Sequence, residues 1–260
     1  MTRICFGPAG TSGLGYEEGL QHCKELGLNA LECEFTYGVR MTNSQAKKIG
    51  ALAKKLGIKL SVHGPYYVNL ASKEKAKLDA SKKRILMSCE RAHYLGASPV
   101  VFHSGYYQGR DEEEVYNIIK EAIIDMQKII KQKKWNVKLA PETTGKKSQF
   151  AGLDTLLRLR KEIKCDICVD FAHLFAREAG KIDYDEIFKK IKSLPHIHCH
   201  FSGITYTAKG ERSHIPLKKD FFMPLAKAIK KYKPKSMAII NESPDIYEDA
   251  VNMQKWFTGK

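Results

Sequence analysis

The chain lacks the features that mark a membrane, secreted or multidomain protein. No stretch approaches the ~18 apolar residues of a membrane span, and Met1–Ser12 has no basic stretch followed by an apolar one, as a secretory signal would. No linker rich in Pro, Ser or Gly, no repeat and no low-complexity segment divides the 260 residues, of which 43% are hydrophobic. We therefore expect one domain spanning residues 1–260, located in the cytoplasm.

Cysteine is too scattered to form a disulfide framework. The number of cysteines is odd, and most lie on apolar segments: Cys5, Cys23, Cys33, Cys89, Cys165, Cys168 and Cys199. This pattern is typical of free, buried thiols in a reducing compartment. Cys165 and Cys168 form a lone CxxC with no second pair to complete a zinc set, so we interpret them as structural.

Acidic residues are outnumbered by basic ones. Lys and Arg total 44 against 29 Asp and Glu, which gives a formal net charge of +15. Such a charge attracts polyanions, nucleic acid above all. The alternative is a charge that serves solubility, because the Lys-rich segments at 73–83, 128–138 and 227–235 are predicted to lie on outer helices.

Strand-like and helical segments alternate about eight times along the chain. The predicted strands are Ile4–Pro8, Ala30–Phe35, Lys59–His63, Pro99–His103, Val137–Glu142, Ile167–Asp170, Ile197–Ser202 and Met237–Glu242. Predicted helices include Glu17–Leu26, Gln45–Leu56, Glu112–Ile130, Tyr184–Ile191 and Leu217–Tyr232. This order favours an α/β fold, a (β/α)₈ TIM barrel. The alternative, an open doubly wound sheet, normally has a glycine-rich phosphate loop after its first strand, and Gly7–Gly13 follows that pattern poorly.

Acidic and imidazole side chains end these predicted strands, where TIM barrels build their active sites. They are His63, His103, Glu142, Asp170, His173, His200 and Glu242. Imidazoles and carboxylates suit Zn²⁺, Mn²⁺ or Fe²⁺, so the set predicts a multinuclear metal site. His196 and His198 share a strand face with His200 but lie deeper in the barrel. His22 and His93 fall in helical pattern, which favours packing or surface roles.

Successive motifs resemble the signatures of the endonuclease IV family, within the xylose-isomerase-like TIM barrel superfamily. They are Val62–Leu70, Phe102–Gly105, Pro141–Gly145, the Asp-x-x-His-x-x-Ala run in Cys168–Ala176, His200–Ser202 and Glu242–Ser243. The resemblance spans roughly Gly7 to Pro244. It implies a zinc-dependent apurinic/apyrimidinic endonuclease, a hydrolase of base excision repair that cuts double-stranded DNA 5′ to abasic sites. A monomer with two or three zinc ions is expected, and manganese is an alternative metal.

The resemblance also implies a role for each ligand. His63, His103 and Glu142 would hold a first metal, and Glu142 would bridge to a second. That second metal would also be held by Asp170, His200 and Glu242, and a third by His173, His214 and Glu211. Glu142, Asp170 and Glu242 are the implied catalytic carboxylates. A bridging anion is needed because two cations ~3.5–4 Å apart repel each other, and bound cations pull the pKa of water towards ~7.

Glu211 departs from the family pattern. The family has an Asp-Arg-His triplet at the third metal, but this chain reads Gly210-Glu211-Arg212-Ser213-His214, which we expect to be a loop. The carboxylate is one residue farther from the histidine, a gap that the extra methylene of glutamate could span. The alternative is a solvent-exposed acid beside a weak or empty third site. The following segment at 215–219 also lacks the family's glycine-rich continuation, and the chain is slightly short.

Three residues are implied to contact DNA. Tyr66 aligns with a family tyrosine that fills the duplex beside an extruded abasic sugar, and Asn69 belongs to the same motif. Arg40 lies in the second strand-to-helix loop, where the family carries an intercalating arginine. The alternatives are a Tyr66 ring that packs the barrel rim and an Arg40 that is merely solvated.

Two other function classes remain open. Glu142, Asp170, His200 and Glu242 are similar to the single-metal set of sugar isomerases and epimerases on related barrels. One metal has no use for His63, His103, His173 and His214 together, whereas a phosphodiesterase cluster does. The third class is a barrel that binds nucleic acid or a protein partner through a degenerate metal site, which incomplete metal loading would support.

Overall fold

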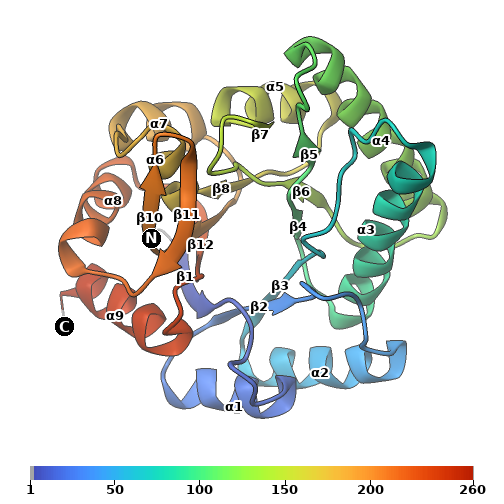
Figure 1. Ribbon diagram of the computed structural model, residues 1–260. Coiled ribbons are helices and arrows are strands. Elements are labelled where there is room, and N and C mark those ends of the chain that lie inside the picture. Colours follow the sequence, from blue (N-terminus) through green and yellow to red (C-terminus); the bar gives the residue numbers. More distant parts are fainter. Residues whose placement is uncertain (1–2, 260) are drawn as a thin grey trace.

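A closed ring of parallel strands forms the centre of the computed structural model, which describes residues 3–259 (Figure 1). The eight strands of the ring are β1 (Arg3–Pro8), β2 (Ala30–Glu34), β3 (Lys59–His63), β4 (Val100–Phe102), β6 (Leu139–Pro141), β8 (Cys168–Asp170), β9 (Ile197–Phe201) and β12 (Ser236–Asn241). Each predicted strand is confirmed, with its bounds shifted by at most two residues.

Helices surround the ring and connect its strands (Figure 1). They are α1 (Tyr16–Glu25), α2 (Asn43–Leu56), α3 (Lys75–Leu95), α4 (Glu112–Gln132), α5 (Leu153–Ile163), α6 (Phe171–Arg177), α7 (Tyr184–Ile191), α8 (Lys219–Tyr232) and α9 (Ile246–Thr258). Local signals set their ends. Thr42 and Gln45 form a capping box at the start of α2, and Gly57 ends that helix in the left-handed region.

The ring closes through two narrow seams. The strands form two four-stranded sheets, in the orders β1-β12-β9-β8 and β2-β3-β4-β6. Parallel bridges between Ala9 and Glu32 and between Glu142 and Cys168 join the two sheets at both edges. The predicted TIM barrel is therefore confirmed, and the open doubly wound sheet is excluded.

Gly7 makes the first seam possible. A Cβ atom at this position would lie 1.9 Å from the carbonyl oxygen of Ala30, so only glycine lets β1 approach β2 this closely. Beside it, the Asn29 Oδ1 accepts a hydrogen bond of 2.9 Å from the Phe6 N–H. This seam holds β2 next to β1, and the two glutamates that β2 carries lie inside the barrel.

Two small antiparallel strand pairs extend the loops at the C-terminal ends of the barrel strands. β5 (Gly105–Tyr106) pairs with β7 (Gln149–Phe150), with α4 and β6 between them in the chain, and β10 (Gly203–Thr207) forms a hairpin with β11 (Gly210–Ile215). The prediction that the segment around Glu211 is a loop is therefore wrong. It is strand β11, and backbone pairing with β10 fixes where its side chains point.

The main hydrophobic core lies between the strands and the helices, and smaller apolar clusters fill the inside of the barrel. All seven cysteines are buried and free, as predicted. None of the helices in residues 3–259 has both the length and the apolar character needed to cross a membrane.

Candidate metal centre

The nine predicted metal ligands converge at the C-terminal mouth of the barrel. His63 and Asp170 end their strands, His200 lies one residue before the end of β9, and Glu142 and Glu242 directly follow β6 and β12. His103 follows β4, His173 lies in the first turn of α6, and Glu211 and His214 lie on β11. The parallel strands of a barrel bring such positions together even though they are far apart in the sequence.

The ligand atoms fall into three groups that match the implied division among three metals. Within each group one ligand atom per residue lies within 4.8 Å of all the others. The groups are His63, His103 and Glu142; Glu142, Asp170, His200 and Glu242; and His173, Glu211 and His214. Glu142 belongs to two of them.

Glu142 lies between imidazoles that approach it from two sides. Its Oε2 lies 3.2 Å from the His63 Nε2 and 3.0 Å from the His103 Nε2. Its Oε1 lies 3.0 Å from the His200 Nδ1 and 3.3 Å from the His173 Nδ1. The residue is fully buried. Each oxygen of this one carboxylate thus faces a different ligand group, which is the arrangement that a bridging ligand needs.

Hydrogen bonds to neutral groups orient three of the imidazoles. The Nδ1 atom of each meets an oxygen: Gly64 O at 2.8 Å for His63, Thr143 O at 3.1 Å for His173, and Ser202 Oγ at 2.9 Å for His214. Donation from Nδ1 leaves the lone pair on Nε2, which faces the carboxylates of the cluster. Metal-binding histidines are commonly held in this way.

Asp170 combines a structural role with a free oxygen. Its Oδ1 accepts a hydrogen bond of 2.7 Å from the His173 N–H and caps α6, so one residue sets the direction of the next ligand. Its Oδ2 is buried and has no hydrogen-bond partner among the described residues. Burial raises the pKa of Asp170 to about 7; the charges of Glu242 and Glu142 add to the rise, and His173 opposes it.

A β-bulge places Glu211 beside His214. In a regular strand, residues three apart face opposite sides. Here Tyr206 pairs with Glu211 and Ile204 pairs with His214, so Arg212 is the extra residue of a bulge. Because Ile204 and Tyr206 lie on one face of β10, their partners share that face. The Glu211 carboxylate lies 3.5 Å from the His173 Nε2 and 3.8 Å from the His214 Nε2.

The donor set fits divalent metal ions. Five imidazoles and four carboxylates meet in a mostly buried mouth, and imidazole with carboxylate is the ligand chemistry of Zn²⁺, Mn²⁺ and Fe²⁺. The Asp170 Oδ2 accepts no hydrogen bond from any described residue and lies 3.2 Å from the His173 Nδ1, so it is free to face a cation. Packing four carboxyl groups this closely is costly unless positive charge separates them.

Sequence reasoning missed two glutamates, the buried Glu32 and the partly buried Glu34. Both lie on β2, where they alternate with the apolar residues Leu31 and Cys33. The Glu32 carboxylate lies 2.8 Å from the Nε2 atoms of both His198 and His200. Burial raises the pKa of Glu34 to about 8 despite the opposing charge of His63. The available signal was the presence of two acidic residues at alternate positions of an otherwise apolar strand.

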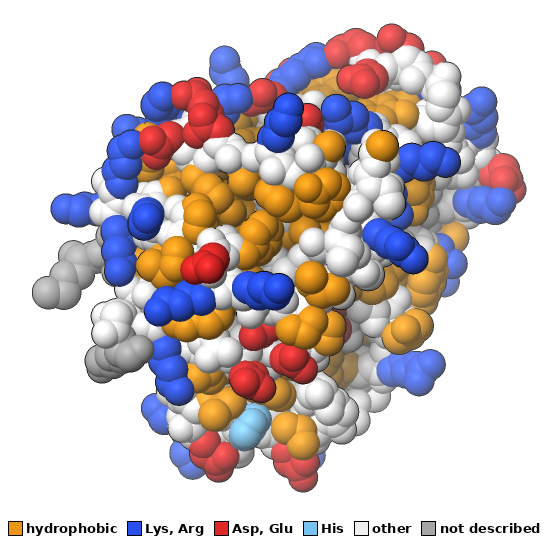
Figure 2. Space-filling model, turned by 60° about the vertical axis from the view of Figure 1, so that its left-hand side comes forward, with side chains coloured by type: hydrophobic (Ala, Val, Ile, Leu, Met, Phe, Trp, Pro, Cys, Tyr) orange, Lys and Arg blue, Asp and Glu red, His pale blue; other side chains and the backbone are white. Residues whose placement is uncertain are grey.

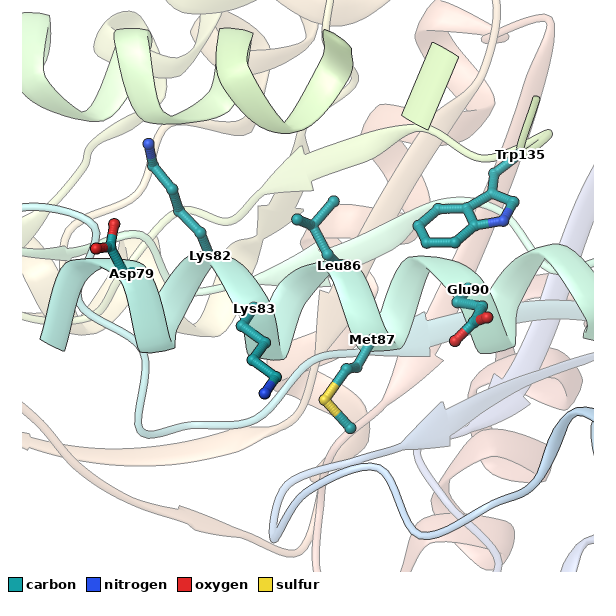
Figure 3. A pocket seen from close by; sticks show the side chains of 7 residues that line it. All are labelled: Asp79, Lys82, Lys83, Leu86, Met87, Glu90 and Trp135. Atoms are coloured by element: carbon teal, nitrogen blue, oxygen red, sulfur yellow. The ribbon is translucent and has the colours of Figure 1, made fainter. Parts of the chain in front are cut away.

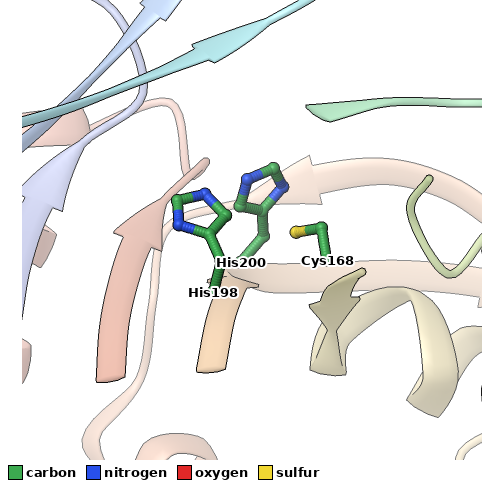
Figure 4. Close-up of side chains that lie close together, drawn as sticks. All are labelled: Cys168, His198 and His200. Carbon is green, nitrogen blue, oxygen red and sulfur yellow. The ribbon is translucent and has the colours of Figure 1, made fainter. Parts of the chain in front are cut away.

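A further set of possible ligand atoms lies one layer deeper in the barrel. It consists of Cys168, His198 and His200, all buried, whose side chains come together from β8 and β9 (Figure 4). His198 was expected to lie deeper than His200, and it does. Cys168, interpreted as structural, packs against Val101 and Ala140.

The three predicted DNA contacts lie on loops at the mouth. The Tyr66 ring is half exposed and packs edge-on against His63, with ring centroids 5.2 Å apart. Arg40 is exposed in the loop between β2 and α2. Asn69 is partly buried, and its Oδ1 accepts a hydrogen bond of 3.0 Å from the Ala71 N–H. Asn69 therefore shapes the loop that carries Tyr66.

A separate hollow lies on the outer helical layer, away from these ligands. It is bordered by one side of α3 and by Trp135 (Figure 3). Its lining mixes charged and apolar side chains: Asp79, Lys82, Lys83, Leu86, Met87, Glu90 and Trp135. It includes none of the ligand groups found in residues 3–259, so the barrel mouth is the candidate site.

Known proteins resemble the chain over nearly all of its length. The model of the family described as xylose isomerase-like TIM barrel matches residues 20–257. An uncharacterized protein of Methanocaldococcus jannaschii is 35% identical, over 98% of this chain and 97% of that protein. A probable endonuclease 4 of Mycoplasma mobile is 29% identical, over 70% of this chain and 68% of that protein.

Solved structures share the fold at low sequence identity. Endonuclease IV from Thermus thermophilus superposes with a TM-score of 0.74 at 18% identity, covering 99% of this chain and 100% of that one. A D-tagatose 3-epimerase-like protein superposes with a TM-score of 0.72 at 20% identity, covering 98% and 96%. The common architecture thus carries both nucleases and sugar epimerases.

Proposed function

Because the chain belongs to the xylose isomerase-like TIM barrel family, we propose that it is a metal-dependent phosphodiesterase that cuts double-stranded DNA 5′ to abasic sites. One observation carries the proposal: the barrel mouth holds three ligand groups, two of which share Glu142. A single-metal enzyme needs only one of these groups. The sequence similarity to a probable endonuclease 4 supports the same function.

Phosphodiester hydrolysis accounts for the number of ligands. Divalent cations held by these groups would polarise the phosphate, acidify a water molecule and stabilise the negative charge on the leaving oxygen. Glu142 holds two ligand groups at a fixed separation, and Asp170 orients His173 through the cap of α6. The side chains of the protein thus contribute to catalysis by holding the ligand groups rigidly in place.

The reaction breaks one phosphorus–oxygen bond. Water adds to phosphorus, the bond to the 3′ oxygen of the preceding nucleotide breaks, and the proton from water ends on that oxygen. The products are a free 3′-hydroxyl and a 5′-phosphate that carries the abasic sugar. The ligand groups provide no separate side-chain nucleophile, and this hydrolysis requires none.

The surface suits duplex DNA, a polyanion, at a position where one base is missing. The formal charge of +15 attracts the phosphate backbone. Figure 2 shows Lys and Arg side chains around much of the outline of one face, with Asp and Glu side chains among them and hydrophobic side chains in the middle. At the mouth, the half-exposed Tyr66 ring can stack where a base is missing, and Arg40 lies exposed on the neighbouring loop.

A labelled duplex with one abasic analogue tests the proposal. We expect metal-loaded protein to cut the strand once, 5′ to the analogue, and to leave the same duplex intact after chelation. An undamaged duplex of the same sequence is the matched control. Absence of cutting by fully metal-loaded protein would refute the proposal.

A sugar isomerase or epimerase is the second candidate. It is favoured by the group Glu142, Asp170, His200 and Glu242, which can by itself hold one cation for a sugar substrate. The His103→Ala and His214→Ala variants distinguish the two functions. Each removes a ligand outside this group, so both should abolish DNA cleavage, whereas a single-metal isomerase should keep its activity on ketoses.

A further inference from the structure

Glu32 joins two histidines at the bottom of the metal centre. Its Oε2 lies 2.8 Å from the His198 Nε2 in a hydrogen bond, and its Oε1 lies 2.8 Å from the His200 Nε2. All three residues are buried. Neither the Glu32 Oε1 nor the His200 Nε2 forms a hydrogen bond of regular geometry with any described residue, so each has an unused hydrogen-bonding capacity that faces the other at 2.8 Å.

The opposite edge of the His200 ring faces the candidate ligands. Its Nδ1 lies 3.0 Å from the Glu142 Oε1 and 3.1 Å from the Glu242 Oε1. A neutral imidazole carries hydrogen on one nitrogen and a lone pair on the other. If the hydrogen is on Nε2, facing Glu32, the lone pair on Nδ1 is free for a cation.

His200 differs from His63 and His214 in the charge of its partner. The Nδ1 atoms of His63 and His214 meet neutral oxygens, whereas the His173 Nδ1 meets the Thr143 carbonyl and, at 3.2 Å, the Asp170 carboxylate. The outer nitrogen of His200 meets a carboxylate.

We propose that Glu32 is a positioning residue for the metal centre: it accepts a hydrogen bond from the His200 Nε2 and thereby fixes the ring in the tautomer whose Nδ1 binds metal. His198 holds the second oxygen of Glu32 and keeps the carboxylate from rotating. The inference rests on the metal centre of the proposed function, and in particular on the group of Glu142, Asp170, His200 and Glu242, which a single-metal enzyme would also use.

A metal site at Cys168, His198 and His200 is the alternative use of this layer. Glu32 lies 2.8 Å from both imidazoles, which is a hydrogen-bond distance. The Cys168 side chain packs against the apolar residues Val101 and Ala140.

Metal affinity of the intact protein tests the proposal, with zinc as the probe. Glu32→Gln keeps the size of the side chain but can accept a hydrogen bond from only one of the two rings. We expect its affinity for the zinc held by Glu142, Asp170, His200 and Glu242 to fall by roughly 10–100-fold, as for other groups that orient metal ligands. The metal-free protein should keep the thermal midpoint of wild type, whereas a purely structural role would lower it.

His198→Gln is the matched control, because glutamine can still donate to the Glu32 Oε2 and leaves His200 with its partner. It should bind zinc like wild type. If Glu32→Gln does not fold, Glu32→Asp replaces it, because aspartate keeps the charge but is too short to reach both rings. Wild-type zinc affinity in the folded Glu32 variant, or equal losses in the His198→Gln control, would overturn the proposal.

The Cys168→Ala variant distinguishes the positioning role from a metal site in the deeper layer. We expect it to bind as many zinc ions as wild type, and one ion fewer would establish a metal site in the deeper layer instead of a positioning role. All these readouts are metal binding, not cleavage. A wild-type protein that binds zinc but leaves abasic DNA intact would refute the proposed function and still test the role of Glu32.

Discussion

Glu142 shows how a single buried side chain can organise the whole site. Its two oxygens face different ligand groups, and four imidazole nitrogens lie within 3.3 Å of them. A neutral side chain at this position would leave two groups without their shared anion. Charge, more than shape, is therefore what Glu142 supplies.

Glu142→Gln should lower DNA cleavage by more than about 100-fold, which exceeds the loss caused by removing a group that only orients a ligand. It should also reduce the number of bound metals, as measured by mass spectrometry of the purified protein. Glu178→Gln, an exposed substitution at the end of α6, is the control and should leave both unchanged. Near-normal cleavage by Glu142→Gln would contradict the shared role.

Tyr66→Ala should weaken binding to abasic DNA and leave the metal content intact. Stacking on one aromatic ring contributes about 1–3 kcal/mol, so we expect binding roughly 10–100-fold weaker in a fluorescence anisotropy titration. Tyr37→Ala is a suitable comparison, because Tyr37 is the more exposed ring but lies on the neighbouring loop. Equal losses of DNA binding in the two variants would show that Tyr66 has no specific role in binding the abasic site.

At the scale of elements, the hairpin of β10 and β11 is what completes the third ligand group. The bulge at Arg212 turns Glu211 and His214 to the same face although three positions separate them. The glutamate side chain and the bulge thus act together to place the carboxylate beside the histidine. A sequence pattern with the usual spacing could not have shown this, because it depends on strand pairing.

Deleting Arg212 together with Glu211→Asp should preserve the third metal. The deletion would make β11 regular and leave a carboxylate two positions before the histidine, on the same face. Glu211→Asp alone keeps the bulge but shortens the side chain, so it should lose one metal. The measurement is metal content at equal protein concentration, and retention of all metals by Glu211→Asp would show that this group does not depend on the reach of glutamate.

The strand ends were the part of the site that the sequence predicted best. Each barrel strand is a short apolar run, and a polar residue at its end stands out, as at His63 and Asp170. The pairing of β5 with β7 was missed because each of these strands has only two residues. Glu32 was missed because its partners, His198 and His200, are 166 and 168 positions away and only the closed barrel brings them together.

For the whole molecule, the proposed function gives the positive charge a role in binding DNA. With a formal charge of +15, attraction to the backbone should be strong and independent of sequence. If about six phosphates are contacted, affinity should fall roughly 10³-fold between 50 and 200 mM salt. Binding of the inactive Glu142→Gln variant to undamaged duplex, measured across salt concentrations, checks this. Affinity that does not change with salt would mean that the charge serves solubility alone.

Anomalous diffraction at the zinc absorption edge will show how many metal ions the barrel mouth binds. We expect three peaks in zinc-loaded crystals: one among His63, His103 and Glu142, one among Glu142, Asp170, His200 and Glu242, and one among His173, Glu211 and His214. A single peak beside Asp170 and Glu242, with the other two groups empty under saturating zinc, would contradict this expectation.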